Sequence, residues 1–135
     1  MQLRLTALLG RELHEASGLS LQDYFVLVVL TERPGGRLRA FELGEELGWE
    51  KSRLSHHISR MAERGLVVRE RCPSDQRGAF VAVTEQGRRE ITAAAPGHVA
   101  AVRTHFVDLL KPEQLDQLGD ITETVLGPLE AGPRP

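Results

Sequence analysis

The chain has 135 residues, of which 17 are basic and 19 are acidic. This length fits one domain with a core of its own, and the formal charge of −2 excludes a protein whose whole surface coats nucleic acid, so any nucleic-acid surface must be local. The single cysteine, Cys72, excludes an internal disulfide framework and fits a reducing cytosol. No apolar stretch approaches membrane-spanning length and the N-terminus lacks a secretory signal, so we expect a cytoplasmic protein with no membrane partner.

Two helices are predicted at the start of the chain. Leucines recur from residue 3 to residue 13 at spacings that suit a helix, and Gly18 ends this pattern. Ser20 followed by Asp23 is a capping-box pattern, which predicts the start of a second helix. The run that follows, to residue 33, is apolar on nearly every side, so we expect the second helix to be buried.

A helix-turn-helix is predicted next. Residues 37–39 suit a short edge strand, and residues 41–47 suit a third helix that ends at Gly48. The apolar side chains of this third helix are expected to face inward: Phe41, Leu43 and Leu47. Only a tight turn separates it from a further helix over residues 51–64, which is the spacing of a helix-turn-helix.

The helix over residues 51–64 has one apolar and one polar face. Leu54, Ile58 and Met61 lie at i, i+4 and i+7 and form one apolar stripe. The other face and its flanks carry polar and charged side chains: Ser52, Arg53, Ser55, His56, His57, Ser59, Arg60 and Glu63. Seven basic and four acidic residues lie between residues 50 and 77, a local excess of positive charge in an acidic chain. This pattern indicates a DNA-reading helix, and the alternative is an ordinary amphipathic helix with a solvated face.

The residues after Gly65 predict a hairpin and then long helices. Strands are expected at 66–71 and 79–83, and they convert the helix-turn-helix into a winged one. Thr84 is a plausible N-cap for a long helix, kinked at Pro96, that continues through Leu110. A final helix is expected to begin at Pro112, and the tail from Gly127 to Pro135 is expected to be frayed.

In this order the elements resemble the MarR family of winged helix-turn-helix transcriptional regulators. The residues that carry the resemblance are Lys51 to Met61, Arg64 to Val67, Asp75, Arg77, Val83, Thr84 and Gly87. The resemblance covers nearly the whole chain and implies a mainly α fold with a small β-wing. It implies a single domain, with a DNA-binding lobe at about residues 20–84 and dimerisation helices at about 1–18 and 85–127. Members usually carry a longer N-terminal segment, so the first helix looks shortened here.

The resemblance also implies partners. These are a second copy of the chain, a pseudo-palindromic operator of double-stranded DNA, and a small-molecule or redox signal that changes the spacing of the two lobes. The resulting hypothesis is a homodimeric repressor that an effector relieves. A winged-helix module that binds protein is the alternative, and its affinity would not fall steeply with salt. No nucleophile with a neighbouring base, no paired carboxylates and no phosphate loop is recognisable in the sequence, so an enzyme is not expected.

Arginines are the main predicted readers of bases. The fork of Arg53 or Arg60 suits guanine in the major groove. His56 is predicted to read a base or a phosphate. Ser52 and Ser55 are predicted to bind phosphate near the helix start. Lys51 and His57 are expected only to position the helix on DNA.

At the wing tip, the resemblance implies that Arg77 enters the minor groove while Asp75 holds its orientation. The alternative is an exposed ion pair that stabilises the turn. Cys72 beside the tip permits a redox hypothesis, against which stands an unreactive residue at a strand end.

Two further groups of residues are candidates for ligand binding. Tyr24 and Phe25 are predicted to line an effector pocket, with plain core as the alternative. His98 and His105 lie seven residues apart on the long helix, with His14 as a third histidine, but without matched ligand spacing ordinary histidines are favoured over a metal site. No metal and no cofactor are therefore expected.

Overall fold

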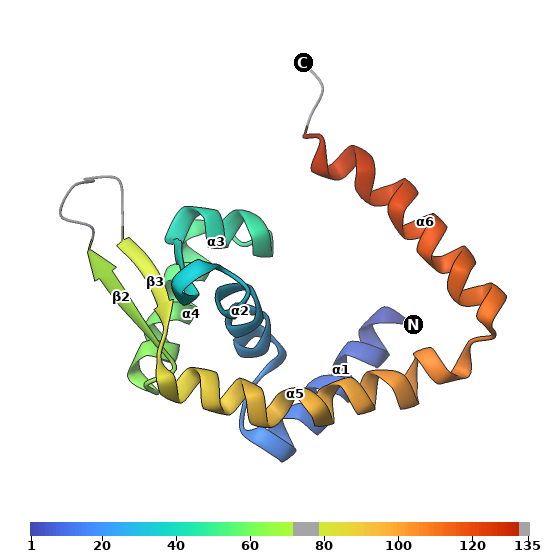
Figure 1. Cartoon of the computed structure of the whole chain (residues 1–135), viewed down its shortest axis with the longest axis horizontal. Coiled ribbons are helices and arrows are strands. Elements are labelled where there is room, and N and C mark those ends of the chain that lie inside the picture. Colours follow the sequence, from blue (N-terminus) through green and yellow to red (C-terminus); the bar gives the residue numbers. More distant parts are fainter. Residues whose placement is uncertain (72–78, 133–135) are drawn as a thin grey trace. The chain divides into compact units, whose positions relative to one another are not determined.

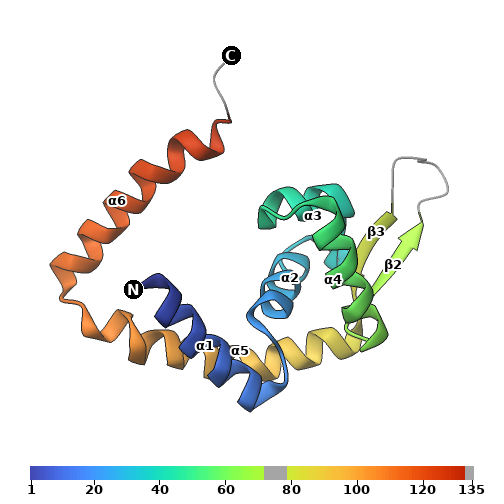
Figure 2. The same cartoon turned by 180° about the vertical axis from the view of Figure 1, so that it is seen from behind.

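The computed structural model describes residues 1–71 and 79–132. They contain six α-helices and three β-strands (Figure 1 and, from behind, Figure 2), as the predicted mainly α fold with a β-wing requires. The elements are α1 (Gln2–Ser17), α2 (Leu21–Thr31), η1 (Pro34–Gly36), β1 (Arg37–Arg39), α3 (Ala40–Leu47), α4 (Lys51–Glu63), β2 (Val67–Arg71), β3 (Ala79–Val83), α5 (Glu85–His105), η2 (Val107–Leu109) and α6 (Pro112–Glu130). By its internal contacts the chain divides into two compact units, Met1–His98 and Val99–Pro135.

The start of α2 is the predicted capping box. Ser20 Oγ accepts a hydrogen bond from the Asp23 backbone N–H at 3.0 Å, and Asp23 Oδ2 accepts one from the Ser20 N–H at 2.9 Å. Two backbone donors that the helix leaves free are thereby satisfied. The helix is buried as expected but ends at Thr31, two residues before the predicted end.

The three strands form one antiparallel sheet in the order β1-β3-β2. Val81 in the central strand pairs with Leu38 of β1 and with Arg69 of β2. Leu38 and Val81 are buried in the same core cluster as the apolar residues of α3 and α4. The wing is therefore attached to the helices by a shared core, which fixes the base of the hairpin beside α4.

The predicted apolar stripe of α4 is confirmed, because Leu54, Ile58 and Met61 are all buried. The prediction for α3 was wrong at Phe41, which is 58% exposed, whereas Leu43 is fully buried. At about 100° per residue, side chains two positions apart point in nearly opposite directions, so Phe41 and Leu43 cannot both face the core.

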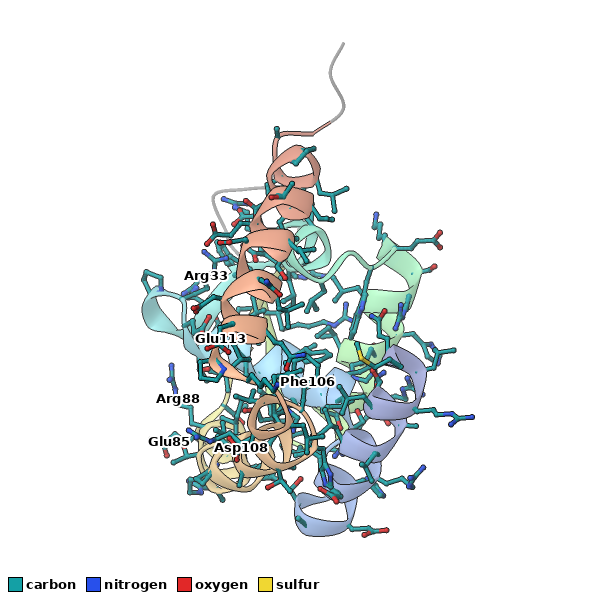
Figure 3. All side chains as sticks on the ribbon, turned by 90° about the vertical axis from the view of Figure 1, so that its right-hand side faces the viewer. Arg33, Glu85, Arg88, Phe106, Asp108 and Glu113 are labelled. Carbon is teal, nitrogen blue, oxygen red and sulfur yellow. The ribbon has the colours of Figure 1, made fainter. Side chains whose placement is uncertain are left out.

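Thr84 begins α5 as predicted. Its Oγ1 accepts a hydrogen bond from the Gly87 N–H at 3.0 Å and donates one to the Gly65 carbonyl at 2.6 Å, so the cap also holds the turn after α4. Glu85 and Arg88 in the first turn are exposed (Figure 3), and the guanidinium of Arg88 lies against Gly36. The first turn of α5 is thus attached, through its cap, to the turn that follows α4.

The ends of the last two helices differ from the prediction. Helix α5 continues through Pro96 but ends at His105 instead of Leu110, because Phe106 leaves helical geometry (φ −140°, ψ −67°). Helix α6 begins at Pro112 as predicted, yet residues 127–130, expected to be frayed, are helical. The Ala131 N–H donates to the Gly127 carbonyl at 3.2 Å and closes the last turn. None of the helices in the described ranges is both long and apolar enough to cross a membrane.

Candidate nucleic-acid interface

One face of α4 presents most of the predicted contact residues to solvent. The exposed ones are Lys51, Ser52, Arg53, Ser55, His56 and Arg60. Their backbone positions follow from the buried stripe on the other side of the helix, since packing of Leu54, Ile58 and Met61 leaves this face outward. This face of the helix therefore carries several hydrogen-bond donors that the core of the described chain does not bury.

Arg53 lies against an aromatic ring. Its guanidinium carbon is 4.6 Å from the centre of the Trp49 ring, in the turn that precedes α4. A guanidinium stacked on an aromatic face keeps the donors at its edges available, because the ring uses only the flat face of the fork. Trp49 thus restrains Arg53 and leaves it able to bind a base or a phosphate.

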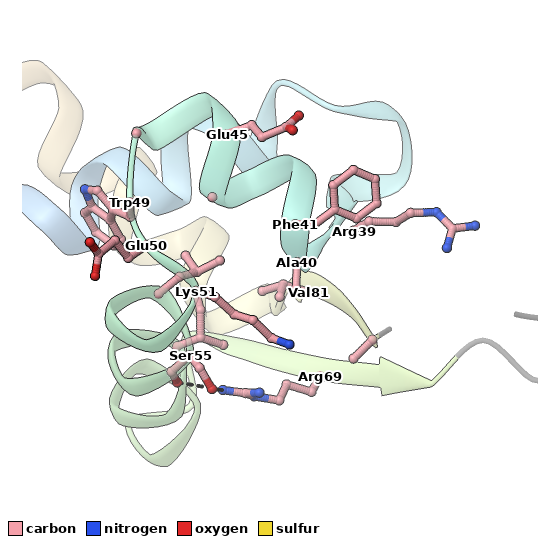
Figure 4. A pocket seen from close by; sticks show the side chains of 15 residues that line it. Arg39, Ala40, Phe41, Glu45, Trp49, Glu50, Lys51, Ser55, Arg69 and Val81 are labelled. Atoms are coloured by element: carbon pink, nitrogen blue, oxygen red, sulfur yellow. Dashed lines mark hydrogen bonds between the residues drawn. The ribbon is translucent and has the colours of Figure 1, made fainter. Parts of the chain in front are cut away.

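Arg69 of β2 connects the wing to α4, a contact that sequence reasoning missed. Its Nη2 donates to the Ser55 carbonyl at 2.6 Å, a pair that Figure 4 shows, and also to Ser59 Oγ at 3.0 Å. Ser55 Oγ lies 3.3 Å from the same nitrogen, so the hydroxyl predicted to bind phosphate already has a protein partner. These contacts fix the wing against α4.

His57 does not lie on the exposed face, and its side chain is only 13% exposed. Its Nε2 lies 2.9 Å from Asp23 Oδ1, although the N–H is not directed along that line. Nδ1 lies 3.3 Å from Arg60 Nη2, and the ring meets Trp49 edge-on with centroids 5.3 Å apart. The sequence contained a signal for this position, because residue 57 lies three positions after Leu54 and four before Met61, which places it at the edge of the apolar stripe.

Asp23 is the charged residue that the described part of the chain buries, with 2% of its surface exposed. Arg64, at the end of α4, donates to its Oδ2 at 2.7 Å and to the Gly18 carbonyl at 3.1 Å. Burial raises the pKa of Asp23, but the hydrogen bonds from Arg64 and Ser20 outweigh it and hold the pKa below its ordinary value. Burial lowers the pKa of His57, and Asp23 opposes that shift in part. The carboxylate is therefore charged and anchors α2 to α4.

A cleft of about 720 Å³ lies between α3, α4 and the sheet. Phe41, Trp49, Lys51 and Arg69 are among its lining residues, and Figure 4 shows them around the opening. The residues predicted for an effector pocket lie elsewhere. Tyr24 is buried with its ring 4.5 Å from that of His98, and Phe25 is 46% exposed.

The predictions for the wing tip fall outside the part of the chain that the structure describes. Cys72, Asp75 and Arg77 fall outside the described residues. Within residues 1–71 and 79–132, no three His, Cys, Asp or Glu side chains are placed to hold a metal ion. His98 has an aromatic neighbour, and burial lowers its pKa.

Comparison with known proteins gives consistent matches. The sequence model of the MarR family matches residues 17–78. Sco3205, a MarR family transcriptional regulator from Streptomyces coelicolor solved in complex with DNA, is 42% identical with a TM-score of 0.87, over 93% of this chain and 81% of that one. CouR from Rhodococcus jostii RHA1, solved with bound p-coumaroyl-CoA, is 28% identical with a TM-score of 0.72, over 90% of this chain and 86% of that one. The transcriptional regulator HosA of Escherichia coli O111:H- is 35% identical over 83 residues, which span 62% of this chain but only 60% of that curated relative.

Proposed function

Because this chain belongs to the MarR family of winged helix-turn-helix transcriptional regulators, we propose that it binds a specific double-stranded DNA operator with α4 in the major groove. The family consists of regulators and not of enzymes. The observation that carries the proposal is the two-faced α4, which buries its apolar stripe and exposes two arginines, a lysine and a histidine. A major groove accepts one such helix and displays a distinct donor and acceptor pattern for each base pair.

Each exposed residue has a proposed role. Arg53 and Arg60 read bases, and His56 reads a base or a phosphate. Lys51 and Ser52 bind phosphate near the start of α4. Ser55 is less available for phosphate, because its hydroxyl and its carbonyl already contact Arg69. The wing-tip residues Asp75 and Arg77 keep the minor-groove role that the family resemblance implies.

The active form is proposed to be a homodimer. No residue of α6 is buried within the single chain, and it exposes large apolar side chains: Ile121, Val125, Leu126 and Leu129. Leu3 of α1 and Met1 just before that helix are exposed as well. An apolar helix face of this kind is stable when a partner covers it. Two lobes related by a two-fold axis then require a pseudo-palindromic operator. The proposed location of the protein is the cytoplasm, together with that operator.

The proposed mode of regulation is repression of transcription that a small-molecule effector relieves. The bound p-coumaroyl-CoA in CouR supports a ligand-responsive member of the fold. The cleft between α3, α4 and the sheet is one candidate place for an effector, and the region of Tyr24 and Phe25 is the other. Cys72 is not needed for this mode.

The proposal is tested by selecting bound duplexes from a random pool at two salt concentrations. We expect enrichment of a two-fold motif whose half-sites lie about one helical turn apart. Affinity should fall steeply with salt, because binding releases counterions from phosphates. A pool that stays random would contradict DNA reading and favour the protein-binding alternative.

Substitution of a base-reading arginine gives a second measurement. Arg53→Ala and Arg60→Ala are each expected to weaken binding to the enriched duplex by about 5- to 150-fold, the equivalent of about 1–3 kcal/mol. Both side chains are exposed, so the melting temperature should change little. Glu63→Ala on the same helix is the matched control, and it should not weaken binding. Equal affinities for wild type and both arginine variants would remove these residues from the site.

A further inference from the structure

A chain of side-chain contacts runs from the buried carboxylate of Asp23 to both proposed base readers. Asp23 Oδ1 lies against His57 Nε2, and His57 Nδ1 faces Arg60 Nη2. The edge of the same imidazole packs on Trp49, whose ring carries the guanidinium of Arg53. One largely buried histidine, His57, is therefore one contact from Arg60 and two contacts from Arg53.

We propose that His57 is a positioning residue for DNA sequence discrimination, which holds Arg60 through Nδ1 and braces the Trp49 ring on which Arg53 lies. It touches no base itself. This inference rests on the proposed function, since it assigns a role in reading the operator.

The contacts select one tautomer of the neutral ring. A proton on Nε2 lies next to the negative carboxylate of Asp23, which is electrostatically favourable. Nδ1 then keeps its lone pair and can accept the hydrogen bond that Arg60 Nη2 donates across 3.3 Å. The opposite tautomer would place two donors against each other and would leave a lone pair facing the carboxylate.

Asp23 is held firmly enough to orient the ring. Its other oxygen accepts from Arg64 at 2.7 Å and from the Ser20 N–H at 2.9 Å. The carboxylate therefore cannot rotate without breaking the capping box of α2 or the ion pair at the end of α4. The position of His57 is in this way tied to the core of the lobe.

Orientation matters because an arginine discriminates guanine only when its fork meets two acceptors together. A free arginine side chain loses considerable rotamer entropy when it binds, and a neighbour that holds it beforehand reduces that loss. Because His57 acts on both arginines, its loss should relax selectivity at two base positions at once. Loss of either arginine should relax only the position that it reads.

Protonation of His57 should release Arg60. With a second proton on Nδ1 both ring nitrogens are donors, and the imidazolium repels the guanidinium. The charged groups that face the ring are Asp23 from α2 and Arg60 and Arg64 from α4. Burial lowers the pKa of His57 from its ordinary 6.5, and Asp23 opposes this only in part. Because the pKa is lowered, discrimination is expected to be intact at pH 7.5 and to decline only once the pH has fallen below 6.5.

The test compares wild type with His57→Gln and His57→Leu. The probes are the duplex that wild type enriches from a random pool and its single-base variants, with binding measured at pH 7.5 and 5.5. Wild type should lose about tenfold in discrimination on acidification. His57→Gln supplies a neutral amide that both donates and accepts, so it should retain discrimination at both pH values. His57→Leu should lose it at pH 7.5, at two base positions, with unchanged affinity for a scrambled duplex.

His14→Gln on α1 is the control, and it should keep the discrimination and the pH profile of wild type. A His57→Leu variant that folds, by its melting curve, and discriminates like wild type overturns the proposal. So does a His57→Gln variant that keeps the wild-type pH profile, which does not depend on whether the leucine variant folds.

A wild-type protein that enriches no duplex means instead that the proposed function has failed. In that case ¹⁵N spectra of the His57 imidazole in the DNA-free protein still test the proposed contacts from Asp23 through His57 to Arg60. The tautomer protonated on Nε2 supports it, and the tautomer protonated on Nδ1 overturns it.

Discussion

Arg64→Ala is expected to lower the free energy of unfolding by about 3 kcal/mol at pH 7, because it strips the principal partner from a buried carboxylate. Asp23 is nearly inaccessible to water, so it cannot recover its hydration when the guanidinium is removed. The Arg64 side chain is itself 44% exposed, and His57 stays beside the carboxylate, which places the effect at the lower end for a broken buried pair.

The matched variant Asp23→Asn should cost less, about 1 kcal/mol. Its amide oxygen can still accept one hydrogen bond, and the half-exposed Arg64 can turn to water. Unfolding by urea at pH 7 measures both effects. A greater loss in Asp23→Asn than in Arg64→Ala would contradict the buried-charge explanation.

The pKa of Asp23 determines how the free energy of unfolding should change with pH. The folded-state pKa of Asp23 lies below its ordinary 3.8, so the stability from its charged state is fully present above that value and is lost as the pH falls through the folded pKa. Without Arg64, burial dominates and raises the pKa of Asp23. The carboxyl group then takes up a proton on mild acidification, so the gap between wild type and Arg64→Ala should narrow from pH 7 towards pH 4. A gap that stays constant would show that Asp23 is not the residue affected.

Gly87→Ala is expected to destabilise the fold by about 2–3 kcal/mol, since an added methyl group has no room. A Cβ there would strike the carbonyl oxygen of Leu66 and come within 2.9 Å of Val83 Cγ2. The Leu66 oxygen belongs to a backbone that Thr84 holds by hydrogen bonds, so it cannot easily move aside. The first turn of α5 would have to shift away from the wing.

Gly97→Ala on the same helix is the matched control. Among residues 1–71 and 79–132, nothing apart from its chain neighbours and the backbone of its own helix lies within 4 Å of a Cβ at that position. The replacement should therefore stabilise the protein by about 0.5–1 kcal/mol through the unfolded state. Thermal unfolding of both variants gives the comparison. Similar melting temperatures for the two variants would mean that the close contacts at Gly87 do not restrict the size of the side chain there.

Local patterns predicted much of this fold. The apolar stripe of α4, the capping box of Ser20 and Asp23 and the cap at Thr84 each depend on spacings within one turn or two, which helical geometry fixes. The order of these elements carried the resemblance to the family. Errors arose at ends, as at His105, where the apolar spacing continues although the backbone leaves the helix.

The site itself was only partly predictable. The sequence by itself determined which helix carries the exposed arginines, because a stripe of three apolar residues dictates the face that must be buried. Only the tertiary structure decided what supports them. Arg64 meets Asp23 across 41 positions, and Arg69 reaches Ser55 across 14. Such contacts have no period along the chain, since they arise when separate elements share a core. That shared core turns His57 away from solvent and towards Asp23.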